Sequence, residues 1–199
     1  MGDEDVDSRR RQLLIVTTGL GLVGSGFAAV PFVKSMQPSA RAKAAGAPVE
    51  VDIGGLEPGQ LKTVEWRGKP VWIVRRTPEM LASLQTDQNL LADPHSAVTS
   101  QQPAYAQNDT RSIKPEFLVL VGICTHLGCS PDKRLEAGAA SRLGPDWPGG
   151  FFCPCHGSKF DLAGRVYRNV PAPTNLVVPP YKYVTDTRVL IGEDHRGTA

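Results

Sequence analysis

The sequence lacks the excess of positive charge that nucleic-acid binding requires. Its 199 residues carry a formal net charge of only +2, and no basic stripe interleaved with aromatic residues is present. Internal repeats are absent as well, and apart from one stretch near the N-terminus the apolar runs are short. With 17 prolines and 20 glycines, this composition favours a turn-rich β protein over a helical bundle. We therefore expect no nucleic-acid partner.

The one long apolar run covers residues 13–33 and contains no charged side chain. As a helix it would be roughly 32 Å long, close to the ~30 Å hydrocarbon core of a bilayer. Arg9, Arg10 and Arg11 stand directly before it, so the positive-inside rule predicts a cytoplasmic N-terminus. A cleaved signal peptide is the alternative, but its apolar region would be shorter and a small-residue cleavage site would follow closely. Residues 8–14 also resemble a twin-arginine export signal, although the arginines could set topology alone.

We divide the chain into four parts. Residues 1–12 form the cytoplasmic N-terminus with the export-like signal, 13–34 a membrane anchor, 35–48 a linker, and 49–199 a folded domain. The linker is alanine-rich and small, and it serves either as spacing or as a hinge. Within the domain we expect short strands at 49–53, 61–66, 71–75, 117–121, 165–167, 176–178 and 188–191. Thr77 and Pro78 are expected to begin a short helix, and 85–112 to form a polar loop.

All four cysteines and two of the four histidines lie in two short boxes, Cys124-Thr125-His126-Leu127-Gly128-Cys129 and Cys153-Pro154-Cys155-His156-Gly157-Ser158. Each box offers one thiolate and one imidazole as metal ligands, and then one further cysteine. Two irons bridged by sulfide can take two thiolates on one iron and two imidazoles on the other. A zinc site is the alternative, but structural zinc ligands mostly stand two to four residues apart, and two cysteines would be left over. The leftover cysteines could join the boxes, which would point away from a reducing cytosol.

These boxes, together with the apolar run and the linker, resemble the Rieske iron–sulfur subunits of ubiquinol–cytochrome c reductases, the cytochrome bc complexes. The resemblance implies a mainly β fold: a Rieske-type antiparallel β-sandwich head with a small cluster-binding subdomain at about 122–173, tethered by one transmembrane helix. It implies a Rieske [2Fe–2S] cluster as cofactor. The implied site comprises Cys124 and Cys153 on one iron, His126 and His156 on the other, a Cys129–Cys155 disulfide, Ser158 donating to a bridging sulfide, Leu127 shielding the cluster, and Gly128 and Gly157 in tight turns.

The resemblance also implies a function. The chain would be the iron–sulfur subunit of a quinol–cytochrome-c reductase, taking one electron from ubiquinol at the cytochrome b subunit and passing it to a c-type cytochrome subunit. His156, beside His126, would accept a hydrogen bond and a proton from the quinol, so the midpoint potential should fall as pH rises. The setting would be a dimeric complex in a bacterial inner membrane, with the cluster domain in the periplasm.

Two positions depart from the family pattern. Many relatives have a tyrosine two residues after the serine that corresponds to Ser158, and its hydroxyl donates to a ligand sulfur; this chain has Phe160. We therefore expect a lower midpoint potential. In the loop 170–173, Val170 stands where glycine is common, and Asn169 is expected to adopt the positive φ instead. A Rieske ferredoxin of a dioxygenase, the small subunit of an arsenite oxidase and a zinc-stapled, membrane-tethered binding module stay open as alternatives.

Overall fold

The computed structural model describes residues 3–40, 46–86, 88–195 and 197–198. The chain divides into two compact units, residues 1–44 and 45–199, and each is described by itself. Residues 41–45 of the expected linker lie outside the described part of the chain.

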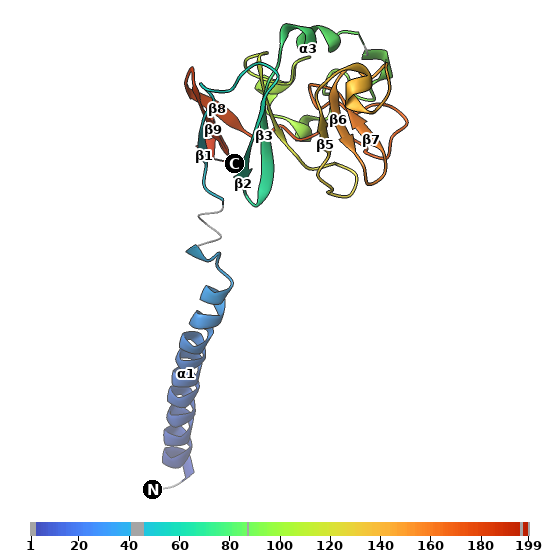
Figure 1. Cartoon of the computed structure of the whole chain (residues 1–199). Coiled ribbons are helices and arrows are strands. Elements are labelled where there is room, and N and C mark those ends of the chain that lie inside the picture. The colour runs from blue at the N-terminus through green and yellow to red at the C-terminus, as the bar shows by residue number, and fades with distance from the viewer. Residues whose placement is uncertain (1–2, 41–45, 87, 196, 199) are drawn as a thin grey trace. The chain divides into compact units, whose positions relative to one another are not determined.

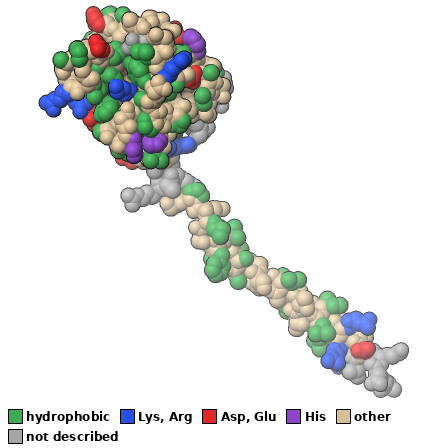
Figure 2. Space-filling view, turned by 90° about the vertical axis from the view of Figure 1, so that its right-hand side faces the viewer, with side chains coloured by type: hydrophobic (Ala, Val, Ile, Leu, Met, Phe, Trp, Pro, Cys, Tyr) green, Lys and Arg blue, Asp and Glu red, His purple; other side chains and the backbone are tan. Residues whose placement is uncertain are grey.

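The first unit is built on one helix, α1 (Asp3–Ser35), which begins well before the expected anchor (Figure 1). Residues 7–35 of this helix are long and apolar enough to cross a membrane. Figure 2 shows basic side chains near its N-terminal end and apolar side chains along the rest. The hydroxyls of Thr17 and Ser25 donate to the carbonyls of Leu13 and Gly21, each at 2.8 Å, so neither needs a partner outside the helix.

The second unit is mainly β and contains three antiparallel sheets of three strands (Figure 1). The first sheet has the order β1 (Val49–Asp52), β9 (Arg188–Ile191), β8 (Tyr181–Thr185). The second has the order β2 (Leu61–Trp66), β3 (Lys69–Arg75), β4 (Phe117–Val121). The third, smaller sheet has the order β5 (Asp132–Arg134), β6 (Gly150–Cys153), β7 (Ser158–Phe160). A short hairpin, β10 (Glu193–Asp194) with β11 (Gly197–Thr198), follows.

The remaining elements are short helices between strands. Helix α3 (Pro78–Ser83) begins as predicted, because the hydroxyl of Thr77 accepts from the amide of Met80 at 3.3 Å and Pro78 occupies its first turn. Single 3-10 turns lie at Gln88–Leu90, Thr99–Gln101, Ala104–Ala106 and Gly138–Ser141. The predicted loop 85–112 therefore contains three such turns.

The alternating patterns predicted five of the strands correctly. The hairpin between β2 and β3 turns through Arg67 and Gly68, whose φ values of 53° and 70° are those of a tight two-residue turn. The strands expected at 165–167 and 176–178 were wrong. Val166 and Tyr167 form only isolated bridges, to Phe160 and Leu91. Residues 176–178 are not a strand, although the Val177 carbonyl accepts from the amide of Val121 in β4 at 2.8 Å. These apolar residues are buried by loop packing, which the same pattern cannot distinguish from a sheet.

The core of the head joins the second sheet to the cluster-binding boxes. All five residues of β4 are buried, and β4 leads directly to the first box. Trp72 on β3 stacks on Phe151 of β6 with ring centroids 5.1 Å apart. Gly122 lets this ring lie against the backbone, since a Cβ there would stand 2.3 Å from Trp72 Cε2. The contact places the two boxes over one continuous core.

Candidate metal centre

Both boxes form loops of the same local shape. The first follows β4, and the second connects β6 to β7. In each, the amide of the glycine donates to the carbonyl of the first cysteine: Gly128 to Cys124 at 3.1 Å, and Gly157 to Cys153 at 2.9 Å. Both glycines have positive φ, 83° and 79°, and a Cβ on either would meet open space. Their backbone conformation, rather than crowding, requires glycine, as predicted.

The structure brings the four predicted ligands together in two pairs, the thiols of Cys124 and Cys153 and the imidazoles of His126 and His156. Cys124 and Cys153 are free and each is 2% exposed, whereas His126 is half-buried and His156 is exposed. The two imidazole rings lie edge to face with centroids 4.8 Å apart. The two thiols are therefore buried, whereas both imidazoles are accessible to solvent.

The electrostatics of the buried side suit a cation. Burial raises the pKa of the Cys124 thiol, and a hydrogen bond with the neighbouring Cys153 thiol adds to this rise. A buried thiolate is costly unless a positive charge compensates it, and a bound metal ion supplies that charge. Two thiols and two imidazoles therefore fit a mixed-ligand di-iron cluster.

The other two cysteines form a disulfide, Cys129–Cys155, which confirms the predicted pairing. The Sγ atoms of Cys129, Cys153 and Cys155 lie within 4.8 Å of one another. Because two of these three sulfurs are already joined, only Cys153 of the group is available to a metal. The disulfide fastens the first box to the second across 26 residues of sequence.

A third loop, 170–174, is fastened to both boxes. The amide of Ala172 donates to Ser158 Oγ at 3.0 Å, and Thr125 Oγ1 donates to the carbonyl of Thr174 at 2.7 Å. The hydroxyl of Ser158 is fully buried and also contacts the Cys124 thiol. As expected, Asn169 adopts positive φ, 58°, at the entry of this loop. Sequence reasoning missed Thr125 and Ala172, because a backbone amide and a threonine between two ligands carry no pattern of their own.

The two remaining positions of interest differ in exposure. Leu127 directly follows His126 in the first box. It is 71% exposed, which is unusual for a leucine. Phe160 on β7 is fully buried and belongs to the same apolar cluster as Cys124 and Cys153. The exposed apolar side chain beside open imidazoles is typical of a docking surface.

The chain is similar to known proteins over nearly its whole length. A family model described as "Ubiquitinol-cytochrome C reductase Fe-S subunit TAT signal" matches residues 1–39, and the model of the Rieske [2Fe-2S] domain matches residues 48–182. The iron-sulfur subunit of ubiquinol-cytochrome c reductase from Allochromatium vinosum is 62% identical, over 100% of this chain and 95% of that protein. Its counterpart from Blastochloris viridis is 42% identical over 93% of each. A chain of a hyperthermophilic respiratory Complex III is 27% identical, with a TM-score of 0.48, over 88% of this chain and 97% of that one.

Proposed function

The chain belongs to the iron–sulfur subunits of ubiquinol–cytochrome c reductase, and from this premise we propose that it takes one electron from ubiquinol and passes it to a c-type cytochrome subunit. It is an electron-transfer subunit of the cytochrome bc complex and carries a Rieske [2Fe–2S] domain. One observation supports the finer proposal: the same two loops supply two buried free cysteines and two histidines with adjacent rings, while a disulfide occupies the other two cysteines.

In the proposed ligand set, Cys124 and Cys153 hold one iron, and His126 and His156 hold the other. When bound, the cluster takes up and releases one electron, at a potential that imidazole ligation raises to as much as about +300 mV in this class. The burial of Cys124 and Cys153 would keep water from the iron that they would hold. The hydroxyl of Ser158 accepts from the amide of Ala172 and keeps its own proton for a sulfur acceptor, so it would stabilise the reduced cluster.

His156 is proposed to meet the quinol. It is the more exposed of the two imidazoles, so its outer nitrogen can accept a hydrogen bond from the ubiquinol hydroxyl and then its proton. His126, half-buried and edge-on to His156, holds the neighbouring position. Leu127 supplies an apolar contact at the cytochrome b subunit, which would receive the second electron of the quinol.

The proposed topology follows from the N-terminal unit. Helix α1 would cross a bacterial inner membrane once, with Arg9, Arg10 and Arg11 on the cytoplasmic side and the cluster domain in the periplasm. The match of residues 1–39 to a twin-arginine signal model supports export of a folded domain. An oxidising periplasm suits the Cys129–Cys155 disulfide. The assembly would be a dimeric complex with cytochrome b and c-type cytochrome subunits.

Purification of the full chain from its native membrane through an affinity tag tests this assignment. We expect b-type and c-type haem to co-purify, with ubiquinol–cytochrome c reductase activity. His156→Gln should abolish both the activity and the EPR signal of the reduced cluster. His95→Gln is the matched control, since His95 has a 76% exposed side chain outside the site, and it should leave both unchanged. A haem-free preparation, or full activity in His156→Gln, would overturn the proposal.

A further inference from the structure

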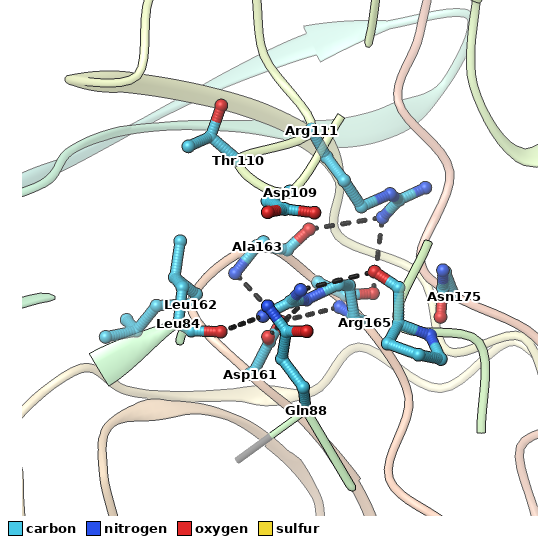
Figure 3. A network of polar contacts seen from close by, with 12 residues as sticks. Leu84, Gln88, Asp109, Thr110, Arg111, Asp161, Leu162, Ala163, Arg165 and Asn175 are labelled. Carbon is cyan, nitrogen blue, oxygen red and sulfur yellow. Dashed lines mark hydrogen bonds and ion pairs between the residues drawn. The ribbon is translucent and has the colours of Figure 1, made fainter. Parts of the chain in front are cut away.

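Three arginines are buried in the β unit and are not used by the site described above. Arg76, Arg111 and Arg165 are 2%, 0% and 1% exposed. They converge on the turn 161–165, which directly follows β7; Figure 3 shows Arg111 and Arg165 at this turn. Arg76 donates to the carbonyl of Leu162 at 3.1 Å, Arg111 to those of Ala163 and Gly164 at 3.2 and 3.3 Å, and Arg165 to the carboxylate of Asp161 at 2.7 Å.

The charges of this cluster do not cancel. Asp161, 5% exposed, pairs with Arg165, and half-buried Asp93 also faces Arg111. Three guanidinium groups face two buried or half-buried carboxylates, and the third carboxylate of the network, Asp109, is 47% exposed and screened by solvent, so the buried interior carries an excess of positive charge. Besides Ala163 and Gly164, the acceptors of Arg111 are the Gln101 carbonyl at 3.3 Å and Gln102 Oε1 at 3.0 Å, all of them uncharged.

The burial and backbone conformation of Arg111 reduce the stability of the fold. Burial lowers the pKa of its guanidinium to about 10, which still leaves it protonated at neutral pH. Its Nε has no hydrogen-bond partner among the described residues, and its φ of 48° is unfavourable for a side chain of this size. A neutral residue would avoid the cost of desolvating a charge. Arg111 combines an unfavourable backbone conformation with a desolvated charge, and such residues cluster at functional sites.

The position of Arg111 relative to the boxes suggests what this role is. Gly164, which accepts from Arg111, also accepts from the amide of Leu176 at 2.8 Å, just after the loop 170–174. A Cβ on Gly164 would lie 3.3 Å from Arg111 Nη1 and 2.8 Å from Leu120 Cδ1, so the guanidinium packs close to β4. Strand β4 leads into the first box, and β7 leaves the second. The buried charge is therefore connected, through Gly164, to β4 and to the segment that follows the loop 170–174.

We propose that Arg111 acts electrostatically: its buried positive charge raises the midpoint potential of the [2Fe–2S] centre. Reduction adds one negative charge to the centre, and a positive charge in a poorly polarisable interior stabilises that state more than the oxidised one. The inference rests on the cluster lying at the two boxes, as proposed above. The midpoint potential would then be set partly by a buried charge and partly by hydrogen bonds to the sulfur atoms.

Redox titration of the purified complex, followed by the EPR signal at pH 6, tests this role. Arg111→Gln removes the charge and keeps an amide donor. We expect the equilibrium constant for reduction to fall several-fold, because a buried positive charge no longer offsets the added electron. Arg111→Lys keeps the charge at this pH and should retain the wild-type midpoint while losing thermal stability. Asp161→Asn removes a negative charge and should raise the midpoint.

Arg188→Gln is the surface control. Arg188 has a 55% exposed side chain paired with Glu50, so solvent screens it and the midpoint should not move. Equal shifts in Arg111→Gln and Arg111→Lys, or a lower midpoint in Asp161→Asn, would mean that the cluster of arginines acts only through structure, and would overturn the proposal. If Arg111→Gln does not fold, the sign of the Asp161→Asn shift decides. Absence of the EPR signal in the wild type would instead refute the proposed ligand set.

Discussion

The β unit has two regions that are stabilised in different ways. We call the sheets β1–β9–β8 and β2–β3–β4 with the loops packed on them the base, and the sheet β5–β6–β7 with the two boxes the cluster-binding part. In the base, the facing segments 71–74 and 118–120 of β3 and β4 are at most 1% exposed, so buried aliphatic and aromatic area holds the sheet. In the cluster-binding part the strands are three or four residues long, and the loops depend on one disulfide, a few hydrogen bonds and buried ions. The base spreads its stability over many contacts, whereas single substitutions should disable the cluster-binding part.

The largest effect should come from removing the disulfide in the double variant Cys129→Ser, Cys155→Ser. Loss of a native disulfide typically costs about 2–5 kcal/mol, and here the cost falls on the two ligand loops. We expect iron content and EPR amplitude to fall to a small fraction of wild type, while far-UV circular dichroism retains the signal of the base. Full iron content in this variant would show that the loops do not need their covalent link.

Leu118→Ala is the counterpart in the base. The side chain of Leu118 is fully buried, and its truncation should lower the free energy of unfolding by about 2–5 kcal/mol. The midpoint potential of the cluster should not change, because Leu118 contributes no charge and no donor. Denaturant unfolding and a redox titration on the same preparation check both parts. A shifted midpoint would mean that the two regions are not separable.

A smaller effect is expected from Thr125→Val, which keeps the shape of the side chain and removes its hydrogen bond to Thr174. One such bond is worth about 0.5–1.5 kcal/mol. The loop 170–174 should open more often, so the cluster should be lost several times faster in the presence of a chelator. Thr125→Ser, which keeps the donor, should behave like wild type; equal loss rates in all three proteins would contradict this role.

Phe160→Tyr should raise the midpoint potential. Phe160 is fully buried in the apolar cluster that contains Cys124 and Cys153, and a hydroxyl directed at a ligand sulfur would stabilise the reduced state. Phe152→Tyr is the control, since Phe152 is half-buried on the neighbouring strand β6 and should leave the midpoint unchanged. An unchanged or lower midpoint in Phe160→Tyr would refute the interpretation of this departure from the family pattern.

The smallest effect lies in the base and depends on pH. Burial raises the pKa of Tyr105 to about 12, while its hydroxyl donates to the Tyr181 carbonyl at 2.9 Å. Because the folded pKa exceeds the unfolded value of about 10, this contribution is complete below pH 10 and is lost as pH rises toward 12. Unfolding free energies measured between pH 9 and 12 should therefore fall, and less steeply in Tyr105→Phe. Equal slopes would contradict this.

The same contrast explains what could be predicted from sequence. The alternation in 61–66 and 71–75 and the apolar run 117–121 predicted the base, because burial in a sheet leaves a periodic pattern. The two boxes led to the ligand set through their resemblance to Rieske subunits, and that ligand set stays a prediction. The role of Arg111 was not predicted, since it lies in a polar segment that reads as a surface loop. Its burial depends on Gly164, 53 residues away, and no local pattern records such a contact.

Pulsed EPR of the dithionite-reduced full chain tests the mixed ligand set of the centre most directly. We expect a [2Fe–2S] signal with hyperfine couplings from two nitrogen ligands, supplied by His126 and His156, and an iron content of two per chain. A signal without nitrogen couplings would contradict the ligand set, and bound zinc with no EPR signal would contradict the electron-transfer function itself.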